Sequence, residues 1–407
     1  MKKTFAVVVG LMGLSAGCNP STLWPFSDAG GGGMSSTSGT GGHGGTNTGG
    51  SGGTAVDSSF RPAALMHSQR CAHTATLLDD GHVLLAGGAS DSGIIADSEV
   101  YLPDADQWDV KSPMQTARGY HTATLLDDGT VLVTGGMNVE TVPLSTAEIY
   151  DPAKAQWTLV EQPMKAPHHS HTATKLPNGN VLVIGGVLNE NGAPEVYNHL
   201  TKTWNPTPPM GAVRQGHTAT LLPSGKVLIV GGTALGPNGS SDVPSAELYD
   251  PSAGPWGAWT SAGAMSAPRS AHTATLLPDG SVLIAGGVNG STPLSSTEIY
   301  HPGSGGPTGQ WVSPAGTGEA MNVPRYTHTA TLLPNGKVLV TGGRFTHADL
   351  YDSAELFDPS LLSWTPTNPP NMETVRAEHT ATLLANGAVL LAGGWKIGPL
   401  CERYSSH

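Results

Sequence analysis

The sequence predicts an all-β fold, a seven-bladed β-propeller built from four-stranded antiparallel blades. The prediction rests on the period of a repeated tetrapeptide and on the constant spacing of a methionine and a Gly-Gly pair around it. The tetrapeptide His-Thr-Ala-Thr occurs seven times, and 46 to 56 residues separate successive histidines. In every copy a methionine lies seven residues before the histidine, and the first glycine of a Gly-Gly pair lies fourteen residues after it. A period near 50 residues indicates a repeat architecture. The seven histidines are His73, His121, His171, His217, His272, His328 and His379.

Each copy contains four predicted strands in a fixed order. His-Thr-Ala-Thr-Leu-Leu and Val-Leu-x-x-Gly-Gly flank a turn such as Asp-Asp-Gly or Pro-Asn-Gly, which is the local signal for a hairpin. The third strand begins at Glu99, Glu148, Glu195, Glu247, Glu298, Glu355 and Glu402. The fourth centres on Trp108, Trp157, Trp204, Trp259, Trp311 and Trp364. Four antiparallel strands repeated radially make propeller blades.

The ends of the repeat region predict how the ring closes. The last copy has no spaced tryptophan, but Phe60 lies six residues before Met66, as Trp108 lies six before Met114. We therefore expect residues 57–64 to supply the outer strand of the seventh blade. An N-terminal strand that completes the last blade removes exposed sheet edges.

The repeats resemble those of the kelch family. The resemblance rests on the Gly-Gly pairs, on Glu-x-Tyr-Asp-Pro at 148–152 and 247–251, and on the spaced tryptophans, and it covers residues 57–407. It implies a β-propeller with one repeat per blade. The first-strand pattern is also similar to that of the galactose oxidase propellers, which belong to the same superfamily.

The first 56 residues resemble the start of a bacterial lipoprotein. Lys2 and Lys3 precede an apolar run, and small residues lead to Cys18, although Ser15 stands where such signals usually have leucine. Residues 1–18 are thus expected to be a signal peptide ending at a lipidated Cys18, with simple secretion as the alternative. Residues 19–56, rich in Gly, Ser and Thr, are expected to be a flexible linker. The protein would then be a lipid-anchored component of the cell envelope, outside the cytoplasm.

Charge limits the partners. The formal net charge is −12, with 19 Lys and Arg against 31 Asp and Glu. A nucleic-acid binder needs a basic stripe to contact phosphates, and the sequence has none. We expect a monomer that binds no nucleic acid.

An arginine lies three residues before the histidine in six copies, and the sequence suggests partners for it. We expect each arginine to pair with the glutamate of the preceding blade, as Arg118 would with Glu99. Arg70 would then pair with Glu402, which would place Cys71 opposite Cys401, and we expect a disulfide there. Such a bond persists outside the cytoplasm.

The repeated histidines are expected to be structural. Seven symmetry-related side chains cannot converge on one tetrahedral ion, and hydrogen bonds to strand or loop backbone would explain their burial. The third copy differs because His168 and His169 precede His171. These three residues are a candidate metal site, although no carboxylate or cysteine joins them at ligand spacing.

The strongest candidate ligand site lies where the copies differ. The residue after Gly-Gly is small or apolar in most copies but is Arg344 in the sixth and Trp395 in the seventh. The 2-3 and 4-1 loops bring further aromatic, cationic and acidic residues to the same face, with ordinary loop packing as the alternative. The full candidate set is Arg344, Phe345, His347, Trp395, Lys396, Tyr326 and Glu378.

These observations favour a non-enzymatic binding or scaffold module, for a protein or glycan ligand and without a cofactor. The alternative is a copper oxidoreductase of the galactose oxidase type. That chemistry needs tyrosine and histidine ligands and a tyrosine cross-linked to a cysteine. Cys71 and Cys401 lack a matching tyrosine context, and no linear motif for hydrolase or phosphate chemistry is present.

Overall fold

A computed structural model describes residues 59–186, 193–236, 239–303, 306, 308–314, 319–346, 348–395 and 397–406. The predicted signal peptide, Cys18 and the linker lie outside the described residues. So do His347 and Lys396 of the candidate ligand site. No helix that is long and apolar enough to span a bilayer occurs in the described part of the chain.

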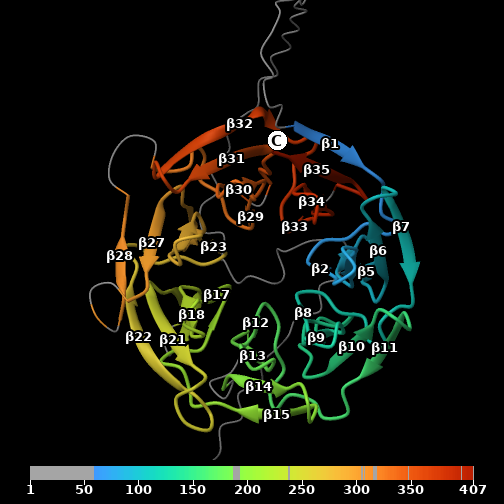
Figure 1. Ribbon diagram of the computed structural model, residues 1–407, viewed down its shortest axis with the longest axis horizontal. Helices are drawn as coiled ribbons and strands as arrows, with labels where there is room; N and C mark the ends of the chain where they lie inside the picture. The colour runs from blue at the N-terminus through green and yellow to red at the C-terminus, as the bar shows by residue number, and fades with distance from the viewer. Residues whose placement is uncertain are drawn as a thin grey trace, which may run out of the picture.

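The protein is an all-β propeller. Its described residues form seven four-stranded antiparallel sheets, and Figure 1 shows these sheets following one another around a ring. We number the blades one to seven by the chain order of their first strands. Short additional sheets lie in the loops: β4 (Ala89–Ser90) with β5 (Gly93–Ile94), β16 (Arg214–Gln215) with β19 (Thr233–Gly236) and β20 (Gly239–Asp242), and β25 (Val288–Asn289) with β26 (Thr292–Pro293).

The first two strands of each blade come from the hairpin pattern. The first strands, nearest the centre in Figure 1, are β2 (Thr74–Leu77), β8 (Thr122–Leu125), β12 (Thr172–Lys175), β17 (Thr218–Leu221), β23 (Thr273–Leu276), β29 (Thr329–Leu332) and β33 (Thr380–Leu383). The second strands are β3 (Val83–Ala86), β9 (Val131–Thr134), β13 (Val181–Ile184), β18 (Val227–Val230), β24 (Val282–Ala285), β30 (Val338–Thr341) and β34 (Val389–Ala392). Every residue of the second strands is buried, because neighbouring blades cover both faces of each sheet.

The third and fourth strands form the outer half of each blade. The third strands are β6 (Ser98–Leu102), β10 (Ala147–Asp151), β14 (Glu195–Asn198), β21 (Ser245–Asp250), β27 (Thr297–His301), β31 (Ser353–Asp358) and β35 (Cys401–Ser405). The fourth strands of blades one to six are β7 (Gln107–Lys111), β11 (Gln156–Leu159), β15 (Thr203–Pro206), β22 (Ala258–Ala264), β28 (Gln310–Val312) and β32 (Ser363–Asn371). The outermost strand of blade seven is β1 (Ser59–Ala63).

Strand β1 joins the two ends of the repeat region. It pairs with β35, and Phe60 lies opposite Tyr404 with 4.9 Å between the ring centroids. Tyr101 and Trp108 of blade one form the same kind of pair at 4.9 Å. Phe60 therefore occupies the position that a tryptophan takes in blade one. The first strand of blade one contacts those of blades two and seven.

The apolar core lies between blades. One cluster joins Leu84 and Val100 of blade one to Val131 and Trp157 of blade two, and similar clusters recur around the ring. The indole nitrogen of Trp157 also donates a 2.9 Å hydrogen bond to the carbonyl of Ser112 in the preceding blade. Five of the six tryptophans thus hold their blade to the preceding one through both packing and an indole hydrogen bond, whereas Trp204 contributes packing alone among the described residues.

The arginine of each repeat pairs within its own blade, so our expected pairing with the preceding blade is wrong. Arg118 Nη2 lies 2.8 Å from Glu148, and its Nη1 donates to the carbonyls of Gly135 and Thr146 at 2.7 and 3.1 Å. Glu148 also accepts from the amides of Gln115 and Thr116. This arrangement, which we call the clamp, ties the incoming loop to its own blade. The six clamps are Arg70–Glu99, Arg118–Glu148, Arg214–Glu247, Arg269–Glu298, Arg325–Glu355 and Arg376–Glu402.

The predicted Cys71–Cys401 disulfide is also wrong, because Cys401 is a free, buried thiol. Its premise fails, since Arg70 pairs with Glu99 and not with Glu402. The backbone of Cys71 forms an isolated antiparallel β-bridge with that of Ala89, near the loops at one end of the propeller. Cys401 lies inside blade seven, between Ala392 and Ala63. The two side chains belong to different apolar clusters.

Candidate ligand-binding mouth

The 2-3 and 4-1 loops meet at one end of the propeller, which we call the mouth, and a ring of backbone hydrogen bonds crosses it. The residue before each repeat histidine donates its amide hydrogen to the carbonyl of the equivalent residue in the preceding blade, at 2.9 to 3.4 Å. Six of these residues have φ between 50° and 55°, and the glycine among them has φ of 61°. The series closes on itself through Ala72, Tyr120, Ser170, Gly216, Ala271, Thr327 and Glu378. This amide ring holds seven side-chain positions around the axis.

The repeat histidines form a second ring directly after the amide ring. Each imidazole Nε2 lies 2.8 to 3.1 Å from the threonine hydroxyl of the preceding blade, as His121 does from Thr74. Burial, together with the nearby arginine, lowers the pKa of His121 and His217 to about 3. These histidines are therefore neutral and structural. Their partner is a side chain of the neighbouring blade, and not the backbone alone as we expected.

Arg344 is the centre of a cluster at the mouth. It is 1% exposed, and its Nη2 lies 2.7 Å from Glu378 of blade seven. Its Nε donates to the hydroxyl of Thr327 at 3.2 Å. The guanidinium carbon lies 5.1 Å from the ring centroid of Trp395 and 6.0 Å from that of Tyr326, within the range of cation–π attraction. The fold thus brings together four of the seven candidate side chains, Arg344, Glu378, Trp395 and Tyr326.

Tyr120 of the second repeat extends this cluster across the axis. Burial, reinforced by the carboxylate of Glu378, raises the pKa of Tyr120 well above 10.0, and the same pair forms a side-chain hydrogen bond. Sequence reasoning missed Tyr120 because it considered the residues before the histidine only in blades six and seven, beside Arg344 and Trp395. At that position the other repeats have Ala72, Ser170, Gly216, Ala271, Thr327 and Glu378, so an aromatic ring was a visible departure.

The cluster presents only part of its surface to solvent. Arg344 and Trp395 are buried, and Trp395 packs on Cys71 and Ala89 of blade one. Tyr326 and Glu378 are half-buried, while Phe345 at the rim is 44% exposed. A ligand at the mouth would therefore contact Tyr326, Phe345 and Glu378, with Arg344 and Trp395 holding them from below.

The three candidate metal ligands of blade three, His168, His169 and His171, do not converge on a site. His171 belongs to the histidine ring and bonds Thr122, whereas His168 bonds the carbonyl of Gly185 at 2.7 Å. The Nδ1 of His169 is 3.4 Å from the Ser170 hydroxyl. Within the described ranges no three His, Cys, Asp or Glu side chains are grouped to hold a metal ion. His168 instead occupies the arginine position of the clamp, with Nε2 3.6 Å from Glu195.

The described residues contain no set of tyrosine, histidine and cysteine side chains arranged to hold copper as in galactose oxidase. The tyrosines of the mouth face Arg344 and Glu378, and the repeat histidines are bound to threonines. Burial raises the pKa of the Cys401 thiol to about 12 and keeps it protonated in an apolar cluster.

Comparisons with known proteins agree with this architecture. The family model described as the KLHDC2/KLHL20/DRC7 Kelch-repeats domain matches residues 170–394, and the Kelch motif model matches residues 118–164. Among solved structures, a fungal alcohol oxidase of the AA5 family, in complex with copper, superposes with a TM-score of 0.69. That match has 20% sequence identity and covers 86% of this chain and 76% of that chain. No curated protein matches the chain.

Proposed function

Since this chain belongs to the kelch-repeat family, we propose that it is a non-enzymatic binding or scaffold module whose mouth recognises a protein or glycan ligand. The observation that carries the proposal is the break in the repeat at blades six and seven. Everywhere else the residue after Gly-Gly is small, aliphatic or methionine, but here the buried Arg344, its partner Glu378 and the rings of Trp395 and Tyr326 converge. Loops on a rigid scaffold are where binding residues concentrate.

The described donor sets support binding over oxidation. An oxidase of the copper type would need histidine and tyrosine ligands that share one site, whereas the mouth tyrosines Tyr120 and Tyr326 face Glu378 and Arg344 and the repeat histidines bond threonines. The likeness to the fungal alcohol oxidase, at 20% sequence identity, is a likeness of fold and does not extend to its copper chemistry.

The test is a peptide and glycan array probed with the purified chain. We expect binding that falls with Tyr326→Ala or Phe345→Ala, because both remove accessible aromatic surface. Val139→Ala is the matched control, since Val139 is 64% exposed in the corresponding loop of blade two. Binding that survives both mouth variants would remove this site. Stoichiometric copper with oxidation of galactose would replace the proposal by the oxidase alternative.

We also propose that the module is tethered outside the cytoplasm through lipidated Cys18 and the 19–56 linker. The supporting observation is the signal-like segment with small residues before the cysteine. Replacing Cys18 by serine should move the protein from the membrane fraction to the soluble extracytoplasmic fraction. Equal membrane association of both forms would contradict the tether.

A further inference from the structure

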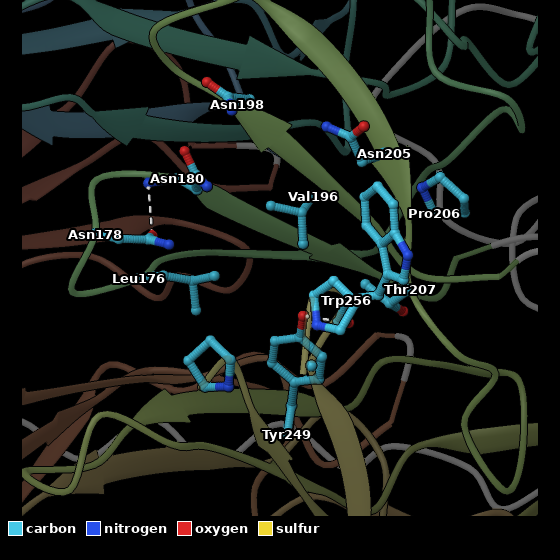
Figure 2. Close-up of a pocket in the computed structure, with 13 residues that line it drawn as sticks. Leu176, Asn178, Asn180, Val196, Asn198, Asn205, Pro206, Thr207, Tyr249 and Trp256 are labelled. Atoms are coloured by element: carbon cyan, nitrogen blue, oxygen red, sulfur yellow. Dashed lines mark hydrogen bonds between the residues drawn. The ribbon is translucent and has the colours of Figure 1, made fainter. Parts of the chain in front are cut away.

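A second candidate site lies at the opposite end of the propeller, between blades three and four. A pocket of about 140 Å³ is enclosed by the 1-2 turn of blade three, the ends of β14 and β15, and the loop between β21 and β22. Antiparallel topology places these turns at the other end of the strands from the mouth. Figure 2 shows Asn178 and Asn180 on one side of this pocket and Trp256 on the other, with Val196 between them.

One wall offers unused hydrogen-bond donors. The carboxamide oxygen of Asn178 accepts from the backbone of Asn180, and that of Asn198 accepts from two amides, of Leu200 and Thr201. Each carboxamide also carries two N–H donors. The nitrogens of Asn178 and Asn198, and the whole carboxamide of Asn205, form no hydrogen bond among the described residues. Backbone contacts fix the orientation of Asn178 and Asn198, while their donors remain available.

The other wall is an exposed indole on a fixed loop. Trp256 is 52% exposed, whereas the framework residue Trp108 is 6% exposed. The hydroxyl of Tyr249 donates to the carbonyl of Trp256 at 3.0 Å. Gly257 has φ of +71°, and a Cβ there would lie 2.4 Å from the Tyr249 ring. The loop is therefore held against Tyr249, and the indole presents about half of its surface to solvent.

The pocket carries no charge. None of its lining residues is an acid or a base that is charged at neutral pH, and burial raises the pKa of Tyr249, its one phenol, above the ordinary 10.0. A neighbouring hollow of about 310 Å³ shares Asn178 and Pro251 with it. The one carboxylate in that hollow, Asp250, is neutralised by Lys226 at 3.1 Å. A charged ligand would find no counter-ion here, so electrostatics select for a neutral one.

We propose that this Asn–Trp pocket binds a neutral oligosaccharide. A pyranose ring has an apolar C–H face that packs on an indole and a rim of hydroxyls that accept from carboxamide N–H groups, so one sugar uses both walls at once. The neighbouring hollow continues the site for the next residue of the chain. This function is independent of the mouth, because the two sites lie at opposite ends of the strands.

The experiment measures binding of cellotetraose, maltotetraose, chitotetraose and mannotetraose to the full chain by saturation-transfer NMR and calorimetry. Trigalacturonate serves as the charged probe. We expect at least one neutral tetrasaccharide to bind with one-to-one stoichiometry. Trp256→Ala and Asn205→Ala should each weaken its affinity by about tenfold, the loss of one stacking surface or one hydrogen-bonding group. Neither side chain belongs to an apolar core cluster of the described residues, so the melting temperature should change little.

Two controls separate this site from other effects. Asn335→Ala removes the asparagine of the 1-2 turn of blade six that corresponds to Asn178 of blade three. Its carboxamide oxygen accepts from the amide of Lys337, and its loss should leave binding unchanged. Tyr326→Ala at the mouth should also leave it unchanged, so failure of the mouth proposal would not imitate failure here. The proposal is overturned if no neutral tetrasaccharide binds, if trigalacturonate binds more tightly, or if binding survives both pocket variants.

Discussion

Two kinds of buried arginine–glutamate pair occur in this propeller, and their surroundings separate framework from candidate site. In the clamp, Arg118 and Glu148 belong to one repeat and bind backbone carbonyls and amides of that repeat. At the mouth, Arg344 of blade six pairs with Glu378 of blade seven, and its other contacts are side chains. The two distances, 2.8 and 2.7 Å, are nearly the same.

The difference shows that pairing geometry alone does not identify a functional site. The clamp satisfies the backbone of a loop that every blade needs, so it recurs six times in the described residues. The mouth pair satisfies no repeated backbone group and fixes aromatic side chains near the axis. We therefore expect loss of a clamp to affect folding, and loss of the mouth pair to affect binding more than folding.

The largest effect should come from acid, which acts on the repeated framework. Burial lowers the pKa of His121, His217 and His328 to about 3, from 6.5 in the unfolded chain. Between these values the unfolded chain binds more protons, so stability falls as the pH falls below 6.5. Each histidine costs about 1.4 kcal/mol per pH unit. The three together should lower the unfolding free energy by roughly 6 kcal/mol between pH 7 and pH 5.

Urea unfolding at pH 7, 6 and 5 measures this loss. A His121→Gln variant that folds should reduce the slope by about 1.4 kcal/mol per pH unit, the contribution of one histidine. An unfolding free energy that stays constant over this range would show that the histidine ring tolerates charge.

The second effect breaks one clamp. Arg118→Ala leaves Glu148 buried without its cation and should lower the unfolding free energy by about 3–5 kcal/mol. Arg403→Ala is the control, because the Arg403–Asp106 pair is partly exposed at 28% and 36% and such pairs contribute about 0–1 kcal/mol. Equal losses in the two variants, measured by urea unfolding, would remove the special role of the clamp.

The third effect tests the mouth pair by the same method. Arg344→Ala should lower the unfolding free energy by about 1–3 kcal/mol, less than the loss of a clamp arginine, because the Glu378 side chain is 11% exposed and can be solvated. Removing both partners in Arg344→Ala/Glu378→Ala should cost less than the sum of the single changes, since no unpaired charge remains. If Arg344→Ala costs as much as Arg118→Ala, the mouth pair is framework as well.

The sequence predicted the propeller, its strand order and the outer strand β1 because these follow from local signals that recur in register. It could not assign the clamp partners. Six repeats have one such arginine and all seven have one such glutamate, so pairing of Arg118 with Glu99 or with Glu148 fits the same period. The path of the loop into the blade decides the matter, and the predicted disulfide failed with that assignment.

The candidate sites show a similar limit. Arg344 and Trp395 were found because each breaks the repeat, and Tyr326 and Glu378 because they lie just before the first strands of the same two blades. Comparison along the chain could not show that Arg344 and Trp395 would be buried, because burial depends on the neighbouring blade. The Asn–Trp pocket was missed although the longer 3-4 segment around Trp256 was visible, since its other wall comes from blade three.

The smallest effect concerns blade three, where His168 replaces the clamp arginine. Its Nε2 lies 3.6 Å from Glu195, beyond hydrogen-bonding distance, while the Glu195 carboxylate still accepts from the amides of Lys165 and Ala166. Blade three thus has the carboxylate of a clamp but lacks the arginine that would pair with it. His168→Arg should add a charge-assisted hydrogen bond and raise the unfolding free energy by about 1 kcal/mol. A loss of stability in urea would mean that blade three has packed around the smaller imidazole, so that the clamp cannot be transferred from one repeat to another.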